Sequence, residues 1–106
     1  MNNESTIILA GTDNDIPSPP PHGLKRYTGL HEMARGATAV LQAGVDSVIG
    51  RTVAIKKLLP EIRTDRYERR RLLREARVTA QLQHPNTVPV YEIGDDDLQG
   101  VYFTMK

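Results

Sequence analysis

Hydrophobic and polar residues alternate in five short stretches of the chain, and one longer stretch has a helical period. The clearest alternation runs over residues 51–59. Val53 and Ile55 fall on one side of this strand, and Lys56 falls on the other side among small and apolar neighbours. β-Branched and aromatic residues predict four further strands, at 27–33, 38–44, 87–93 and 100–105. Short connections join the first three strands, so we expect them to form an antiparallel meander.

A helix is predicted from Asp65 to about Leu82. Asp65 offers a side-chain acceptor at the N-cap, and Glu68 adds a carboxylate in the first turn. The sequence His84-Pro85-Asn86 ends the helix, because the residue before a proline is biased away from the helical conformation. Five residues at spacings of three and four form the side that faces the sheet: Leu72, Glu75, Ala76, Thr79 and Leu82. The predicted fold is therefore α+β, a five-stranded antiparallel sheet with one long packed helix.

Lys56 and Glu75 are expected to form an ion pair. An ammonium on an apolar strand face needs an anionic partner. Glu75 is the only acid on the predicted inward side of the helix. Packing that side on the sheet brings Glu75 toward Lys56.

The connections between the predicted strands contain small and acidic residues. Residues 34–37 form a tight turn of small side chains, which lets the backbone come close to a ligand or simply reverses the chain. Residues 44–50, bracketed by glycines, link the second and third strands. Residues 94–97 contain three adjacent aspartates without the pattern of a calcium loop, so we interpret them as a hairpin turn. His22 and His31 lack metal-ligand spacing and receive no metal role.

Residues 1–23 are polar and turn-rich, and we interpret them as a disordered, Pro-rich leader. Pro17 and Pro20 make a P-x-x-P spacing, which fits either a semi-extended linker or a docking motif. The folded domain is predicted to cover residues 24–106.

Composition limits the classes of function. The chain has 106 residues, of which 39% are hydrophobic and 25% charged, and its formal net charge is +1, so no global field steers it onto nucleic acid or an anionic membrane. It contains no cysteine, which excludes disulfides and thiolate chemistry. No apolar run approaches the ~20 residues of a membrane helix. We expect a soluble, cytoplasmic protein.

The predicted helix is rich in arginine: Arg66, Arg69, Arg70, Arg71, Arg74 and Arg77. Such a face is most often merely solvated, but it also suits an acidic partner or a phosphate backbone. Glu68 and Glu75 interleave with the arginines, and no aromatic stacking platform accompanies them. We therefore expect no nucleic-acid partner.

Five features occur in one order along the chain: a small-residue turn at 34–39, Val53-Ala54-Ile55-Lys56, Arg74-Glu75-Ala76, His84-Pro85-Asn86 and Val101-Tyr102-Phe103-Thr104-Met105. From Leu24 to Lys106 the chain resembles the amino-terminal, ATP-binding lobe of a bacterial serine/threonine protein kinase of the eukaryotic-like type.

The resemblance implies an ATP site. Lys56 matches the lysine that contacts the α- and β-phosphates, and Glu75 matches the glutamate that positions it. Six residues match the glycine-rich phosphate loop: Ala34, Arg35, Gly36, Ala37, Thr38 and Ala39. The remaining matches place Leu41 and Ala54 over the adenine, Met105 at the gatekeeper position and Lys106 at the start of the hinge.

Two departures from the family pattern bear on activity. Only Gly36 keeps a glycine in the loop, and an alanine at a position with positive φ would be strained. The family's second lobe, which carries the catalytic aspartate and holds Mg²⁺, has no counterpart in these residues. We expect a kinase fragment that binds ATP weakly and transfers no phosphate alone. The alternative is a stand-alone lobe that acts as a protein-interaction or regulatory module, with the missing lobe or another protein as its partner.

Overall fold

The computed structural model describes residues 23–82 and 88–106. In chain order these residues form η2 (Gly23–Arg26), β1 (Tyr27–Arg35), β2 (Ala39–Asp46), β3 (Thr52–Leu58), η3 (Pro60–Ile62), α2 (Arg66–Gln81), β4 (Val90–Asp96) and β5 (Gly100–Met105). Residues 1–22 of the proposed leader, including its prolines and His22, and the His84-Pro85-Asn86 segment lie outside the described residues. The last residue assigned to the leader, Gly23, instead begins η2.

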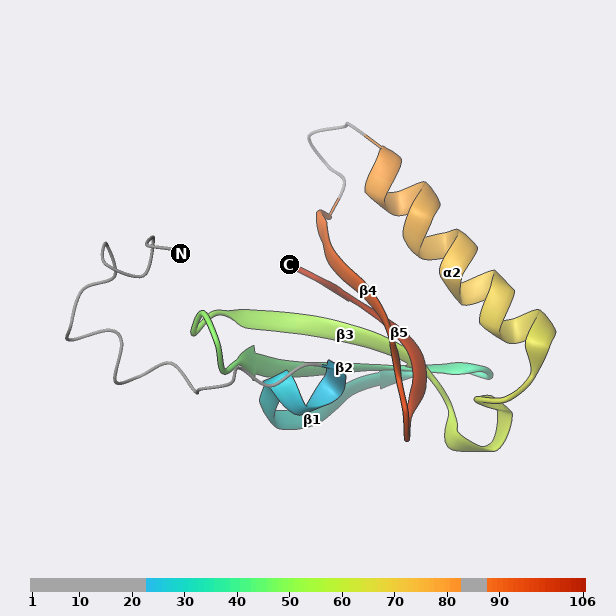
Figure 1. Cartoon of the computed structure of the whole chain (residues 1–106), viewed down its shortest axis with the longest axis horizontal. Coiled ribbons are helices and arrows are strands. Elements are labelled where there is room, and N and C mark those ends of the chain that lie inside the picture. Colours follow the sequence, from blue (N-terminus) through green and yellow to red (C-terminus); the bar gives the residue numbers. More distant parts are fainter. Residues whose placement is uncertain (1–22, 83–87) are drawn as a thin grey trace, which may run out of the picture.

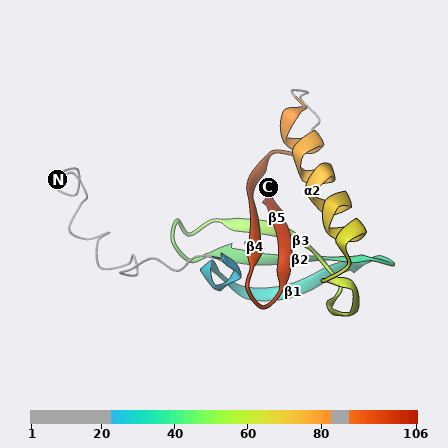
Figure 2. The same cartoon turned by 45° about the vertical axis from the view of Figure 1, so that its right-hand side comes forward.

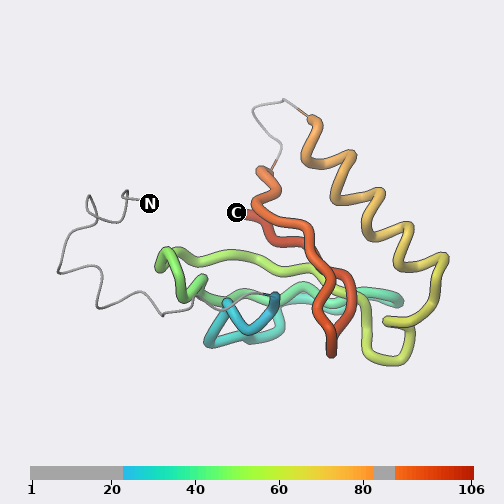
Figure 3. The backbone as a smooth tube through the Cα atoms, viewed as in Figure 1, coloured from blue at the N-terminus to red at the C-terminus, as the bar shows by residue number. Residues whose placement is uncertain are grey.

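The strands form one antiparallel sheet in the order β1-β2-β3-β5-β4. The helix α2 lies along one face of this sheet only (Figures 1 and 2). The traced backbone shows β4 and β5 running side by side, and β5 continues the sheet next to β3 (Figure 3). The predicted α+β architecture, five antiparallel strands and one packed helix, is confirmed.

Alternation along β3 and β5 divides the core into two clusters, one on each face of the sheet. The first cluster holds Leu24, Tyr27, Val53, Ile55 and Tyr102. The second cluster, beneath α2, holds Leu58, Leu72, Ala76, Val101 and Phe103. Lys56 shares the face of Leu58, since the two are two positions apart in one strand, with only Lys57 between them. The predicted placement of Lys56 on the helix-facing side is therefore confirmed.

The helix begins and ends close to the predicted positions. Asp65 is the N-cap, and its side chain accepts a hydrogen bond from the Glu68 amide at 3.0 Å. Leu82 is the C-cap. However, the predicted inward stripe is wrong at its end, because Leu82 is 55% exposed, whereas Leu73 packs against the second cluster. None of the helices among the described residues is long and apolar enough to cross a bilayer.

Three predicted turns are shorter than expected. β1 continues to Arg35, so only residues 36–38 form the first turn. β2 runs through Gly44 to Asp46, because a glycine there leaves room for Leu30, whose Cδ2 lies 2.5 Å from the position a Cβ would take. β4 contains residues 94–96, and only 97–99 form the last turn. There Asp96 accepts bonds from the amides of Leu98 and Gln99.

Candidate active site

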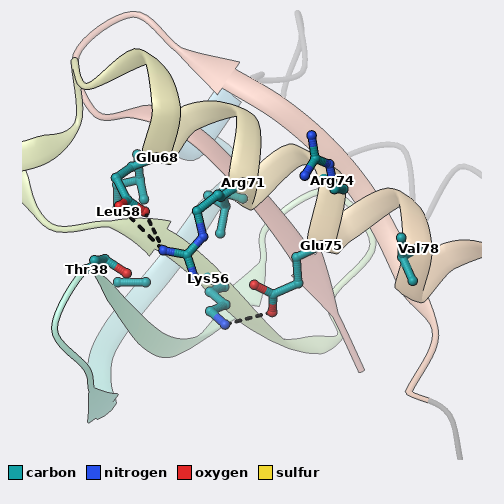
Figure 4. Close-up of a pocket in the computed structure, with 10 residues that line it drawn as sticks. Thr38, Lys56, Leu58, Glu68, Arg71, Arg74, Glu75 and Val78 are labelled. Atoms are coloured by element: carbon teal, nitrogen blue, oxygen red, sulfur yellow. Dashed lines mark hydrogen bonds and ion pairs between the residues drawn. The ribbon is translucent and has the colours of Figure 1, made fainter.

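Lys56 on β3 and Glu75 on α2 form an ion pair, with Nζ and Oε2 2.7 Å apart (Figure 4). β3 holds Lys56 directly between Leu41 of β2 and Phe103 of β5. The next residue of α2, Ala76, is fully buried against the sheet, and this packing fixes the position of Glu75. The side chains of Lys56 and Glu75 are 31% and 47% exposed, so the pair is partly open to solvent although β3 is the central strand of the sheet. The ion pair predicted from the sequence is confirmed.

A cavity of about 640 Å³ opens beside this pair, between the β1–β2 hairpin, β3, β5 and α2. Nine of the predicted site residues line it: Ala34, Arg35, Gly36, Thr38, Ala39, Leu41, Lys56, Glu75 and Met105. Ala37, Ala54 and Lys106 do not line it, although Ala54 pairs directly with Met105 across the strands. The volume falls in the usual range for small-molecule sites.

Four residues that were not predicted as site residues also line this cavity: Val40, Thr79, Val88 and Phe103. The sequence contained a signal for two of them. Thr79 lies four residues after Glu75 on the same side of the helix. Phe103 precedes Met105 by two residues, so both point to one face of β5. Val88 was predicted to lie within the strand at 87–93, but β4 begins only at Val90, so the predicted start of this strand is wrong.

A smaller cavity of about 420 Å³ lies on the other side of the ion pair, toward the start of α2 (Figure 4). Glu68 and Arg71 line it and bond to each other at 3.2 Å. Glu68 is seven residues before Glu75, which is two helical turns, so it shares the inward side. Glu75 is therefore not the only acid on that side, which corrects the sequence interpretation.

The turn at residues 36–38 is closed by a hydrogen bond from the Gly36 amide to the Ala39 carbonyl at 2.8 Å. No residue other than glycine has a positive φ in the described part of the chain, so the alanines that replace glycines here carry no backbone strain. Within that same part, the amides of Ala37 and Thr38 donate no backbone hydrogen bond. Of the two residues, only Thr38 lines the cavity, so its amide is the one available to an anion there.

The ionisable groups with shifted pKa values lie away from the ion pair and support the sheet. Burial acts to raise the pKa of Asp46, but bonds from Arg26 and from the amides of Val48 and Ile49 outweigh it and hold that pKa below its usual value. Burial, followed by the nearby Arg63, lowers the pKa of Lys57. Lys57 bonds Gln99 and points to the other face of β3 from Lys56.

Burial also raises the pKa of Tyr102 to about 12, and a hydrogen bond to Glu92 adds to this effect. Glu92 accepts a second bond from the Tyr27 hydroxyl at 2.5 Å. The Tyr27 contact ties β1 to the β4–β5 hairpin on the face of the sheet opposite α2.

Candidate metal ligands are dispersed. Within residues 23–82 and 88–106, no group of three or more His, Asp or Glu side chains is placed to hold a metal ion. His31 is on β1, where Nδ1 lies 3.3 Å from the Gly29 carbonyl oxygen.

Comparisons of the sequence with known proteins relate this chain to protein kinases. No family model matches the chain. The chain is 37% identical over 82 residues to the serine/threonine-protein kinase PknD of Chlamydia muridarum, an alignment that covers 77% of this chain and 9% of PknD. It is 40% identical over 76 residues to the serine/threonine-protein kinase PksC of Streptomyces coelicolor, covering 72% of this chain and 14% of PksC.

Over about three quarters of its length, the chain is thus homologous to a short region of bacterial serine/threonine protein kinases. The resemblance inferred from the sequence is confirmed to this extent. The chain spans only 9% to 14% of the length of these curated relatives.

Proposed function

We propose that this chain is the nucleotide-binding lobe of a serine/threonine protein kinase and that its ligand is ATP. The observation that carries the proposal is the Lys56–Glu75 ion pair at the edge of the 640 Å³ cavity. A lysine ammonium is a compact charge suited to phosphate oxygens. The carboxylate of Glu75 keeps that ammonium at the mouth of the cavity.

The two ends of the cavity suit the two ends of a nucleotide. Leu41 and Met105 line the cavity and supply an apolar wall for the adenine ring. The resemblance also assigns Ala54 and Lys106 to this end of the nucleotide. Thr38 and the ammonium of Lys56 supply polar groups at the phosphate end.

Phosphotransfer requires chemistry beyond these residues. The resemblance assigns two further groups to a second lobe: Mg²⁺, which neutralises charge on the phosphates, and the aspartate that orients the acceptor. We propose that this lobe acts together with a catalytic lobe, supplied by a longer polypeptide or by a partner protein, and transfers no phosphate without it. The cytoplasmic location stays a prediction.

Titration with a fluorescent N-methylanthraniloyl derivative of ATP tests the site. We expect a saturable signal that unlabelled ATP displaces. Leu41→Ala should weaken binding by roughly fivefold, because it removes apolar contact with the base. Val45→Ala is the matched control, since Val45 is on the same strand, 41% exposed and outside the cavity. Equal affinities in the two variants, or no saturable signal, would refute the site.

A further inference from the structure

The outer side of α2 carries arginines that the proposed nucleotide site does not use. Arg66, Arg70, Arg74 and Arg77 follow one another at spacings of four, four and three residues, so they lie on one side of the helix. All four are exposed, whereas Leu72 and Ala76 are buried on the other side. Arg74 also lines the smaller cavity with Lys56 and Glu75, but in Figure 4 its guanidinium extends away from these two side chains. We refer to these four residues as the arginine row.

The positive charge of the arginine row is uncompensated in the described part of the chain, where none of its members forms an ion pair. The two acids of α2 are engaged elsewhere, Glu68 with Arg71 and Glu75 with Lys56. Another helix arginine, Arg69, pairs with Asp95 of β4. Like charges four residues apart destabilise a helix. The stability of the fold therefore does not explain the row.

We propose that the arginine row binds an acidic, extended segment of a partner protein. Successive arginines four residues apart are separated by about 6 Å along the helix axis. Alternate side chains of an extended polypeptide are separated by about 6.6 Å. Carboxylates at alternate positions of such a segment thus meet successive guanidiniums, whose planar donors bind carboxylates in pairs.

The surroundings of the row favour a polypeptide over a nucleic acid or a membrane. Tyr67 at one end and Val78 and Leu82 at the other are exposed apolar side chains next to the arginines. They offer contacts to the apolar side chains of a peptide, which a phosphate backbone lacks. The whole chain has a net charge of only +1, so the attraction is confined to this row.

Fluorescence anisotropy with the full chain and a labelled peptide of alternating glutamate and alanine tests the proposal at low salt. The double variant Arg70→Gln/Arg74→Gln should bind the peptide roughly fivefold to tenfold more weakly than the wild type. The double variant Arg66→Gln/Arg77→Gln should weaken peptide binding to a similar extent, which gives an independent check. The control variant Lys25→Gln/Arg51→Gln removes the same charge elsewhere and should change affinity by less than about twofold.

Two further probes identify the class of partner. A single-stranded oligonucleotide and phosphatidylserine vesicles should both bind more weakly than the acidic peptide. The peptide assignment would be overturned if the oligonucleotide or the vesicles bound more tightly than the peptide and the arginine variants lost that binding. Absence of peptide binding, or equal weakening in the arginine and control variants, would also overturn it. No member of the row lines the larger cavity, and Arg66 and Arg77 line neither cavity, so the Arg66→Gln/Arg77→Gln result is independent of nucleotide binding.

Discussion

Lys56 and Glu75 are nineteen residues apart in the sequence, yet their charged atoms lie 2.7 Å apart across the junction of β3 and α2. The pair joins the helix to the sheet at the mouth of the larger cavity. Since both side chains are partly exposed, its contribution to folding is small, less than about 1 kcal/mol. Its position beside the cavity indicates a role in placing the ammonium.

Glu75→Gln separates the structural and positioning roles of the pair. We expect the free energy of unfolding to fall by less than about 1 kcal/mol. ATP affinity should fall about tenfold, because Lys56 is no longer held at the cavity. Urea unfolding and nucleotide titration measure the two effects. Glu68→Gln is the control, because Glu68 lines only the smaller cavity; the same loss of affinity in both variants would argue against a special role for Glu75.

The N-cap of α2 gives a second prediction. Asp65 accepts a hydrogen bond from the Glu68 amide, one of the otherwise unpaired donors in the first turn. Asp65→Ala should lower the free energy of unfolding by about 0.5–2 kcal/mol, whereas Asp65→Asn should nearly preserve it. Urea unfolding followed by circular dichroism measures both. Equal stability of all three proteins would mean that the side-chain cap contributes nothing.

Acid should destabilise the fold partly through Asp96. Its carboxylate accepts bonds from the amides of Leu24, Leu98 and Gln99, and the Leu24 bond is the main cause of a pKa below the usual 3.8. A lowered folded-state pKa stabilises the protein above the unfolded value, and this stability is lost as the pH falls through the folded-state pKa.

Unfolding midpoints from about pH 7 to about pH 2.5 test this linkage. Asp96→Asn should be less stable than the wild type at neutral pH, and the difference should shrink below about pH 4. Asp97→Asn, in the adjacent turn, is the control and should follow the wild type. A difference between wild type and Asp96→Asn that does not change with pH would contradict the linkage.

Much of the fold follows from local patterns. Alternation along β3 correctly placed Lys56 on the helix-facing side, and helical spacing placed Glu75 toward it. Asp65 was correctly assigned as the N-cap, because its side chain is short and polar and precedes the periodic stretch.

The predicted and observed folds differ where tertiary contacts override local sequence signals. Gly44 is typical of a turn, but it lies within β2 because Leu30 occupies the space of its missing side chain. Leu82 has the spacing of a core residue, but it is the C-cap, where the helix ends and its side chain is exposed. Val88 was assigned to a strand by its β-branched neighbourhood, but it lines the cavity just before β4 begins at Val90.

The most direct test of the central claim is the effect of Mg-ATP on the thermal unfolding of Lys56→Met. A ligand that binds only the folded state raises the unfolding midpoint. We predict that Mg-ATP stabilises the wild type and Lys57→Met alike, because Lys57 points to the other face of β3 and bonds Gln99. Lys56→Met should show no such stabilisation. Equal responses of the wild type and Lys56→Met would contradict the phosphate-binding role and leave Lys56 as half of a structural ion pair.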